Sequence, residues 1–400
     1  MALRVRANGN VQLGKRDATL KFENVKTRLA AKSLATKSSH VGTRAALGNI
    51  SNVATSTGST SLINAKKVGK KDGKTTRVLG KSKATSSLHS LAAKLPEPIV
   101  EQPKSPEAMD FDDILPKMIS RPFNVEDIDQ DDHESPQLCS EYVKDIYQYM
   151  HYLERKYKVE DYMESQEINV RMRTILVDWL VQVHLRFHLL QETLFLTIQL
   201  IDRYLALHSV SKNNLQLVGV TAMFIASKYE EMYPPEINDF VYITDNAYTL
   251  NQIKSTECLM LKTLDYNLGK PLCLHFLRRN SKAAGVDAQK HTLAKYLMEL
   301  TLPDYTFVMY DPSEIAAAAL CASMRLLEDE AEWDSKMEYY SNYTRGEVAP
   351  IVEKMAQLIL RSETSKYQAV RNKFASSKFM KISTISELKP ASVKRYLLDS

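Results

Sequence analysis

One stretch of the sequence has the clearest helical pattern, Arg171-Met172-Arg173-Thr174-Ile175-Leu176-Val177-Asp178-Trp179-Leu180-Val181-Gln182-Val183-His184. Its apolar residues recur at intervals of three and four, so Met172, Ile175, Leu176, Trp179 and Val183 line one face of a helix. Helical spacing by itself predicts that this face belongs to a hydrophobic core.

The same periodicity continues on both sides of this stretch. Before it, Tyr142, Ile146, Tyr149 and Leu153 fall on one helical face. After it, helices are expected over residues 194–205, 218–229, 253–264, 271–276, 291–302, 313–327 and 348–360.

Strand signals are scarce, and the best of them, Phe240-Val241-Tyr242-Ile243-Thr244, is short. The small residues of 218–229 indicate a buried central helix, and Pro234-Pro235 cannot continue it. Two successive groups of about five helices therefore predict an all-α fold with two small helical domains in tandem.

The N-terminal part has a different composition. From Met1 to Ser105 there are 20 lysines and arginines against 5 acidic residues, and Phe22 is the single aromatic residue. Such a segment buries too little apolar surface to offset its ordering entropy, so we expect it to be disordered. Residues 106–134 reverse the charge, with 10 acidic residues against Lys117 and Arg121.

The four cysteines, Cys139, Cys258, Cys273 and Cys321, are far apart and form no CxxC pair. Free cysteines in a large chain favour a reducing compartment. No histidine cluster has metal-ligand spacing, so no metal and no other cofactor is expected. No run reaches the roughly 18 apolar residues of a membrane span. We expect a soluble, intracellular protein.

The helix 171–184 resembles the signature helix of the cyclin box. Other segments match that family in order: Leu200-Ile201-Asp202-Arg203-Tyr204-Leu205, Ala226-Ser227-Lys228-Tyr229-Glu230-Glu231, Phe240-Val241-Tyr242-Ile243-Thr244-Asp245 and Pro271-Leu272-Cys273-Leu274-His275-Phe276-Leu277-Arg278-Arg279. The resemblance covers roughly 136–380. Phe276-Leu277-Arg278-Arg279 and residues 291–300 look like the mitotic B-type cyclins.

This resemblance implies two tandem five-helix cyclin-box domains with an N-terminal helix, preceded by a long disordered basic tail. The expected divisions are a tail with a destruction box, an acidic linker, an N-terminal helix with the first box, a second box and a C-terminal tail. They span 1–105, 106–135, 136–267, 268–380 and 381–400, respectively.

The resemblance also implies a kinase clamp, in which the chain pushes helix αC of a mitotic cyclin-dependent kinase inward and closes the Lys–Glu pair that orients ATP. Lys228 and Glu257 match the cyclin residues that hydrogen-bond to the kinase. Apolar kinase contacts match Tyr142, Ile146, Tyr229, Leu261, Tyr266 and Leu268. The plain alternatives are an ordinary exposed ion pair and core packing.

A substrate-docking patch for Arg-x-Leu peptides matches Met172, Ile175, Leu176, Trp179, Gln182 and Gln216. Gln182 stands where many cyclins have Glu, which predicts a weaker attraction for the basic end of a docking peptide. Core packing is the alternative for the apolar members. Arg173 and Asp202 match a buried structural ion pair between the first two helices of the box.

A phosphate-binding pocket of the B-type family matches Arg278, His291 and Lys295. His291 and Lys295 are four residues apart and share a helical face. Three cationic donors can hold a phosphorylated serine or threonine of a partner. A solvated basic face is the alternative.

The tail contains Arg44-Ala45-Ala46-Leu47-Gly48-Asn49-Ile50-Ser51-Asn52, which fits the destruction-box pattern R-x-x-L-x-x-x-x-N. The resemblance implies capture by the mitotic, anaphase-promoting ubiquitin ligase, with Arg44, Leu47, Ile50 and Asn52 as its contacts. An extended, disordered peptide suits a binding groove.

Ser105 and Ser135 precede prolines and are candidate proline-directed phosphorylation sites. The apolar residues Met109, Phe111, Ile114, Leu115, Met118 and Ile119 resemble the export and retention region of B-type cyclins. The alternative is a linker that touches the folded domain. We expect shuttling between cytoplasm and nucleus, with a centrosome or spindle location as a further option.

Two other classes of function are alternatives to a kinase-activating role. An enzyme is not indicated, because there is no glycine-rich phosphate loop, HRD, DFG, HExxH or GxSxG motif, so no catalytic residues are assigned. A nucleic-acid-binding helical module would use the basic tail for phosphates. The predicted folded part has no obvious basic helix, so we expect protein partners and no specific nucleic acid.

Overall fold

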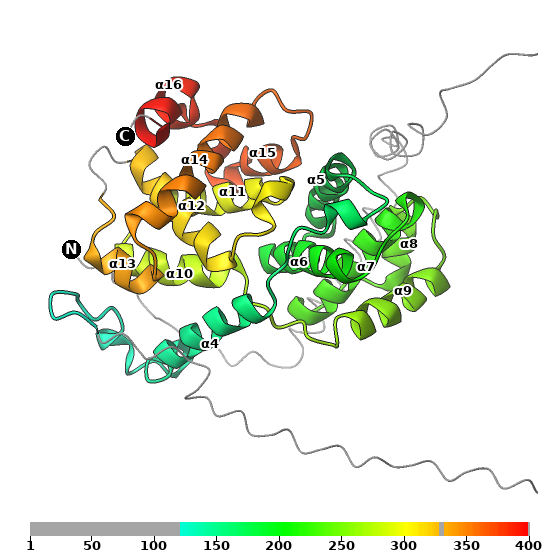
Figure 1. Cartoon of the computed structure of the whole chain (residues 1–400), viewed down its shortest axis with the longest axis horizontal. Helices are drawn as coiled ribbons and strands as arrows, with labels where there is room; N and C mark the ends of the chain where they lie inside the picture. The colour runs from blue at the N-terminus through cyan, green and yellow to red at the C-terminus, as the bar shows by residue number, and fades with distance from the viewer. Residues whose placement is uncertain (1–120, 328–331, 399–400) are drawn as a thin grey trace, which may run out of the picture. The chain divides into compact units, whose positions relative to one another are not determined.

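The computed structural model describes residues 121–327 and 332–398, and within these two ranges it contains helices and no β-strand (Figure 1). The prediction of an all-α fold is confirmed for this part of the chain. The helices of the first domain are α5 (Val170–Phe187), α6 (Gln191–Leu207), α7 (Leu215–Glu230), α8 (Ile237–Ile243) and α9 (Leu250–Thr263).

Helix α7 is the buried centre of the first domain, as its small residues predict. Every residue from Leu217 to Ser227 is buried. A Cβ atom at Gly219 would stand 2.8 Å from a methyl carbon of Leu176, so the absence of a side chain lets α5 approach α7 closely. The helix ends at Glu230, before Pro234.

Local signals place the ends of the neighbouring helices. The side chain of Asn169 accepts a hydrogen bond of 3.0 Å from the backbone N–H of Met172 and so caps α5. Thr249 and Gln252 form a capping box at the start of α9.

The strand signal of residues 240–244 proved misleading, because this segment lies mostly in helix α8. Phe240 and Ile243, three residues apart, are buried, while Tyr242 is exposed, which is a helical pattern rather than an alternating one. A capping box of Glu236 and Asp239 starts the helix, and the Phe240 ring packs 5.3 Å from that of Phe224.

The second domain repeats the principle around the alanine-rich helix α12. Its helices are α10 (Cys273–Ala284), α11 (Ala288–Thr301), α12 (Pro312–Leu327), α13 (Ser335–Ser341), α14 (Arg345–Ser362) and α15 (Ala369–Phe374). Gly285, with φ of 63°, ends α10 in the left-handed conformation that favours glycine.

The predicted C-terminal tail, residues 381–400, is folded over its described part. Ile382, Val393 and Leu397 are buried in the hydrophobic core. This segment contains η8 (Ile382–Thr384), η9 (Ser386–Leu388), α16 (Pro390–Val393) and the π-helical turn η10 (Lys394–Leu398). The sequence predicted a C-terminal tail over these residues and assigned no helix to it, because its short apolar segments have no helical periodicity. In the structure η8 packs onto α11 and α15, and η9, α16 and η10 pack onto α12 and α14.

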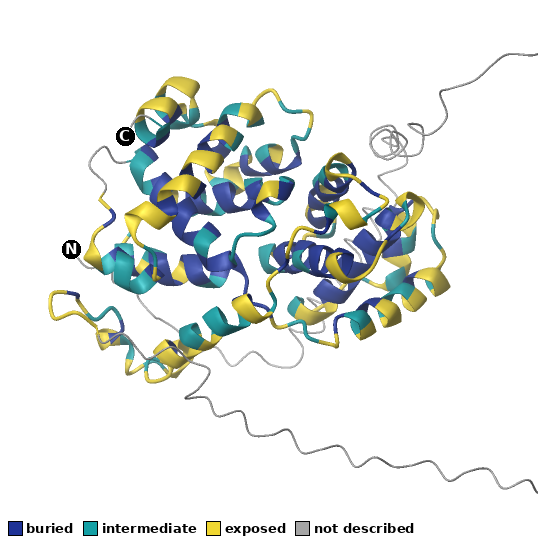
Figure 2. Cartoon of the chain, in the orientation of Figure 1, coloured by how far each residue is buried: buried dark blue, intermediate teal, exposed yellow. Residues whose placement is uncertain are grey.

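Helix α4 (Val143–Lys156) precedes the first domain in sequence but packs on the second. The Tyr147 hydroxyl donates to the carbonyl of His275 at 3.0 Å, and the carboxylate of Glu154 accepts from the Ser313 hydroxyl at 2.7 Å. Figure 2 shows mostly half-buried and exposed residues on α4, in contrast to α7 and α12. One side of α4 is therefore anchored while the other faces solvent.

Candidate functional site

The end of α7 and the middle of α9 meet at an ion pair between Lys228 and Glu257. Their side chains are 43% and 14% exposed, so the pair lies at the surface of the first domain. The Lys228 ammonium also lies 4.2 Å from the centre of the Phe224 ring, a cation–π contact. An exposed pair of this kind contributes roughly 0–1 kcal/mol to folding, so stability alone gives little reason for it.

Four large side chains on α7, on α9 and in the turn after α9 are exposed or half-buried. Tyr229 and Tyr266 are 55% and 64% exposed, and Leu261 and Leu268 are half-buried. The turn after α9 holds Tyr266 in a left-handed conformation, φ 55°, with its N–H bonded to the Leu261 carbonyl at 2.9 Å. We call the following residues the α7–α9 surface: Lys228, Tyr229, Glu257, Leu261, Tyr266 and Leu268.

Helix α4 presents Tyr142 and Ile146, which are 62% and 41% exposed. Its C-terminal end is joined to the α7–α9 surface by Arg203, to which the sequence analysis gave no role. The Arg203 guanidinium lies 4.6 Å from the centre of the Tyr157 ring and donates to the Asn267 carbonyl at 2.7 Å. The two groups of predicted kinase contacts therefore lie on adjoining elements.

The predicted substrate-docking patch is only partly at the surface. Met172, Leu176 and Trp179 are buried, the last two at 1% exposure. Their helical spacing places them against α7 and the rest of the core, so they do not form an exposed groove in this structure. Ile175 and Gln216 are half-buried and Gln182 is exposed.

The exposed member of that patch has a carboxylate neighbour. The Gln182 amide donates to Asp178 at 3.1 Å, and the other Asp178 oxygen accepts from the backbone N–H of Ala369 at 2.9 Å. Burial raises the pKa of Asp178. Asp178 thereby ties α5 of the first domain to the start of α15 in the second.

The three residues of the predicted phosphate pocket come together on α10 and α11. Arg278 is exposed, His291 is half-buried with its Nδ1 2.8 Å from the Ser281 hydroxyl, and Lys295 is half-buried. Burial, together with the charges of Lys295 and Arg278, lowers the pKa of His291. His291 is therefore neutral near pH 7 unless an anion raises its pKa.

A carboxylate for which the sequence gave no signal already pairs with one of these three cationic residues. Glu192, at the start of α6, forms an ion pair with Arg278. Burial raises the pKa of Glu192, but the hydrogen bond and charge of Arg278 outweigh it, and the net pKa is lowered. A phosphate that binds Arg278 must compete with this internal carboxylate.

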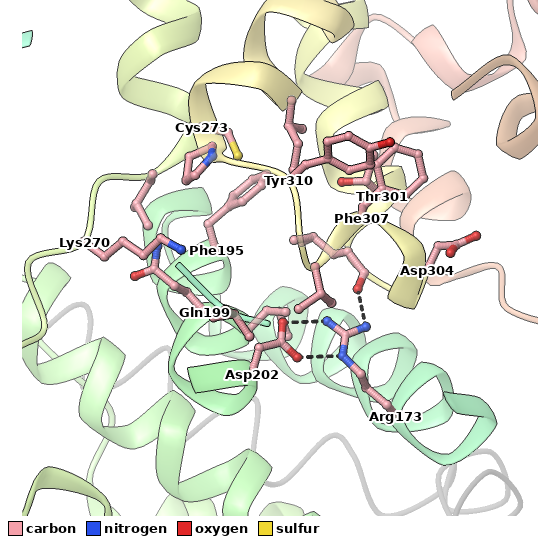
Figure 3. A pocket seen from close by; sticks show the side chains of 17 residues that line it. Arg173, Phe195, Gln199, Asp202, Lys270, Cys273, Thr301, Asp304, Phe307 and Tyr310 are labelled. Carbon is pink, nitrogen blue, oxygen red and sulfur yellow. Dashed lines mark hydrogen bonds and ion pairs between the residues drawn. The ribbon is translucent and has the colours of Figure 1, made fainter. Parts of the chain in front are cut away.

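The predicted ion pair of Arg173 and Asp202 is present and is bidentate, with both N–O distances 2.7 Å (Figure 3). The Tyr162 hydroxyl also donates to Asp202 at 2.8 Å. The remaining Arg173 nitrogen donates to the Leu302 carbonyl at 3.0 Å, so the pair fixes the first domain to the second. The resemblance implied only a contact within the first domain.

Beside this pair lies a cavity of about 90 Å³, lined by Gln199, Lys270 and Tyr310 among others (Figure 3). Ligand pockets usually measure ~300–1,000 Å³, so this cavity is too small for a nucleotide or similar substrate. It belongs to the contact between the domains.

Ranges 121–327 and 332–398 contain no group of three or more His, Cys, Asp or Glu side chains able to hold a metal ion. No helix in that part of the chain is long and apolar enough to cross a membrane. Ser135 is half-buried at the start of η3 (Pro136–Leu138). Several predicted sites lie outside the described residues: Arg44, Leu47, Ile50, Asn52, Ser105 and the apolar residues of 109–119.

Two protein-family models match this chain and adjoin each other. The model of the cyclin N-terminal domain matches residues 145–269, and that of the cyclin C-terminal domain matches 271–388. The two helical domains are therefore tandem cyclin domains. The predicted outer boundaries of the tail and the linker are not tested by these matches and stay predictions.

Relatives that match this chain over most of their length give the narrower assignment. The chain is 58% identical to G2/mitotic-specific cyclin-B of Marthasterias glacialis, over 94% of this chain and 98% of the relative. It is 57% identical to G2/mitotic-specific cyclin-B of Arbacia punctulata, over 99% and 98% of the two chains. A Hydra vulgaris cyclin-B is 59% identical over 67% of this chain and 74% of its own length.

The chain belongs to the cyclin family, within its G2/mitotic-specific B-type branch. As a cyclin it is a cell-cycle regulatory subunit that activates a cyclin-dependent kinase, and it is not itself an enzyme.

Proposed function

We propose that this chain binds a mitotic cyclin-dependent kinase as a heterodimer through the α7–α9 surface and α4, and so controls the G2/M transition. The observation that carries the proposal is the exposure of Tyr229 and Tyr266 on the surface that holds the Lys228–Glu257 pair, together with that of Tyr142 at the start of α4. Exposed aromatic residues around a charged pair are typical anchors of protein interfaces.

The energetics favour a stable complex. Burying apolar surface contributes roughly 25 cal/mol per Å², and the exposed parts of these tyrosine rings supply such surface. Lys228 and Glu257 are already paired, so the complex loses less side-chain freedom when the kinase hydrogen-bonds to them. Contact with helix αC in its inward position gives the chain a higher affinity for the active kinase, which is how binding becomes activation.

Substrate docking would use the accessible side of α5 and the start of α7. Gln182, Ile175 and Gln216 supply its surface, while Trp179 and Leu176 support it from the core. A neutral Gln182 and a small apolar area favour weak, transient docking of protein substrates.

Removal of the chain would follow from the destruction box of residues 44–52, captured by the anaphase-promoting ubiquitin ligase. The sequence pattern and the basic composition of 1–105 support this proposal. In the variant Arg44→Ala with Leu47→Ala, the half-life through mitotic exit should lengthen severalfold while kinase activation stays unchanged. Unaltered degradation timing in cell extract would refute the destruction box.

We also propose shuttling between cytoplasm and nucleus, with the apolar residues of 109–119 as the export region and the centrosome or spindle as a further location. Replacing Leu115 and Ile119 by Ala should shift a fluorescent fusion toward the nucleus. An unchanged distribution would contradict this role.

The decisive experiment measures histone phosphorylation by an inactive mitotic cyclin-dependent kinase, phosphorylated on its activation loop, with and without the full chain. We expect the full chain to stimulate the kinase strongly and to show no activity by itself. The double variant Lys228→Glu with Glu257→Ala should not stimulate the kinase. Lys254→Glu, at an exposed position of α9, is a matched control that should stimulate it normally. Full stimulation by the double variant would refute the assignment of the α7–α9 surface to kinase binding.

A further inference from the structure

An acidic segment ahead of α4 lies on the second domain, outside both cyclin domain matches. We call residues 121–132 the strap. Val125 is 1% exposed, and the Ile128 N–H donates to the Tyr340 hydroxyl of α13 at 3.1 Å. The same hydroxyl donates to the Glu126 carbonyl at 2.9 Å, so the strap is bound along its length.

The centre of this contact is Asp129. Its two oxygens accept bidentate hydrogen bonds of 2.5 and 2.6 Å from Arg279 of α10, and Lys282 donates to it at 3.0 Å. The side chains of Asp129 and Arg279 are only 9% and 8% exposed. Bidentate, charge-assisted bonds in such a place are both strong and specific in geometry.

Arg279 connects the strap to two helices. Its guanidinium lies 5.3 Å from the ring centre of Tyr147 on α4 and 5.1 Å from that of Tyr340 on α13. Asp129 therefore holds the guanidinium in the position where it packs against α4. The Tyr147 hydroxyl, bonded to the His275 carbonyl, fixes the other end of the same ring.

We propose that the strap is an internal ligand of the second domain and that its docking through Asp129 positions α4 for the kinase. The positioning role rests on the proposed function, because it assigns the exposed side of α4 to the kinase contact. Arg279, noted in the sequence only as part of a B-type motif, is the positioning residue.

The charge pair dominates this docking because the strap has little apolar surface. Val125 is its one buried apolar residue and Ile128 is half-buried. Without the carboxylate, a buried guanidinium would lose its counter-ion, which is strongly unfavourable. Detachment of the strap exposes Arg279 to water and relieves this cost, while the cores of both domains stay intact.

The first test measures amide hydrogen exchange at Ile128 in the full chain. Asp129→Asn keeps the size of the side chain and removes its charge, and we expect protection at Ile128 to fall at least about tenfold. Asp131→Asn is the matched control, since Asp131 is exposed and has no ion pair in the described structure. Lys282→Gln, a surface change, should give an intermediate loss.

The second readout is the kinase affinity of the same variants. Asp129→Asn should weaken binding about threefold to tenfold, because α4 is in place in only a fraction of the molecules. Asp131→Asn should bind like the unaltered chain. Full protection at Ile128 in Asp129→Asn would overturn the docking, and lost protection with unchanged affinity would overturn the positioning role. Failure of the unaltered chain to bind would refute the proposed function itself, leaving the exchange measurement to judge the docking.

Discussion

Two ion pairs in this chain join the same kinds of charge in opposite surroundings. Arg173 and Asp202 are 1% and 8% exposed and connect the two domains, whereas Lys228 and Glu257 are 43% and 14% exposed on the α7–α9 surface. Buried pairs are costly to break and exposed pairs contribute little to folding. The first pair is therefore structural, and the second is available to a partner.

The largest effect is expected at the buried pair. Arg173→Met should lower the free energy of unfolding by about 3–5 kcal/mol, because Asp202 would remain buried without its counter-ion. Adding Asp202→Leu should recover part of this loss, since no charge is then left alone. Urea unfolding of the two single variants and the double variant measures the coupling. Additive losses would contradict the structural pair.

A buried titratable group without a counter-ion extends the comparison. His184 is 4% exposed, and its Nδ1 has no hydrogen-bond partner among the residues that the structure describes. Burial, with the nearby charge of Lys373, lowers the pKa of His184 to about 3. The unfolded chain binds this proton near pH 6.5 and the folded chain does not. The stability that neutral His184 provides is therefore full above pH 6.5 and is lost as the pH falls toward 3.

Between pH 7 and pH 5 this effect should cost the unaltered chain about 2 kcal/mol more than it costs His184→Asn. Thermal or urea unfolding at both pH values measures the difference. Parallel pH profiles of the two chains would show that His184 titrates normally.

At the exposed pair of Lys228 and Glu257 we expect a small effect on stability and a larger effect on kinase binding. Lys228→Ala should change the free energy of unfolding by less than about 0.5 kcal/mol. It should weaken kinase binding about tenfold, because the kinase loses a pre-positioned donor. Calorimetry of the complex and urea unfolding of the free chain separate the two effects. A large stability loss with normal binding would assign Lys228 to the fold.

The smallest effect is expected at Glu192. Glu192→Gln should raise the affinity for a phosphoserine peptide about twofold to fivefold, since the phosphate then no longer competes with a carboxylate for Arg278. Fluorescence anisotropy at low salt is the measurement, and Glu160→Gln, exposed and unpaired in the described structure, is the control. Equal affinities would mean that Arg278 takes no part in phosphate binding.

Much of the fold was predictable from spacing alone. The run 171–184 and the alanine-rich residues 313–327 have long periodic patterns, and both are helices in the structure. Residues 240–244 were misleading because five residues are too few to separate a strand from a short helix whose capping box starts it. The sequence predicted no helix in 382–398, because the short turns of this segment have no period to detect.

The candidate sites divide in the same way. The resemblance assigned Lys228 and Glu257 to the kinase contact, and the structure shows that they form an ion pair at the surface. Their contact with the kinase stays a prediction. The resemblance assigned Leu176 and Trp179 to a docking patch, whereas their helical spacing predicted core packing, and in the structure both are buried in the core. Arg203, Glu192 and Asp129 carried no local signal, because each acts through a partner distant in the chain.

By itself the sequence determined the all-α class, the two-domain plan and the family, since these depend on local periodicity and on ordered motifs. Only the tertiary structure decided which side chains face a partner and which are core, because burial depends on packing between segments far apart in sequence. It also decided that α4 and the strap pack on the second domain. The bond between Asp129 and Arg279, 150 residues apart, is a long-range contact that no local pattern encodes.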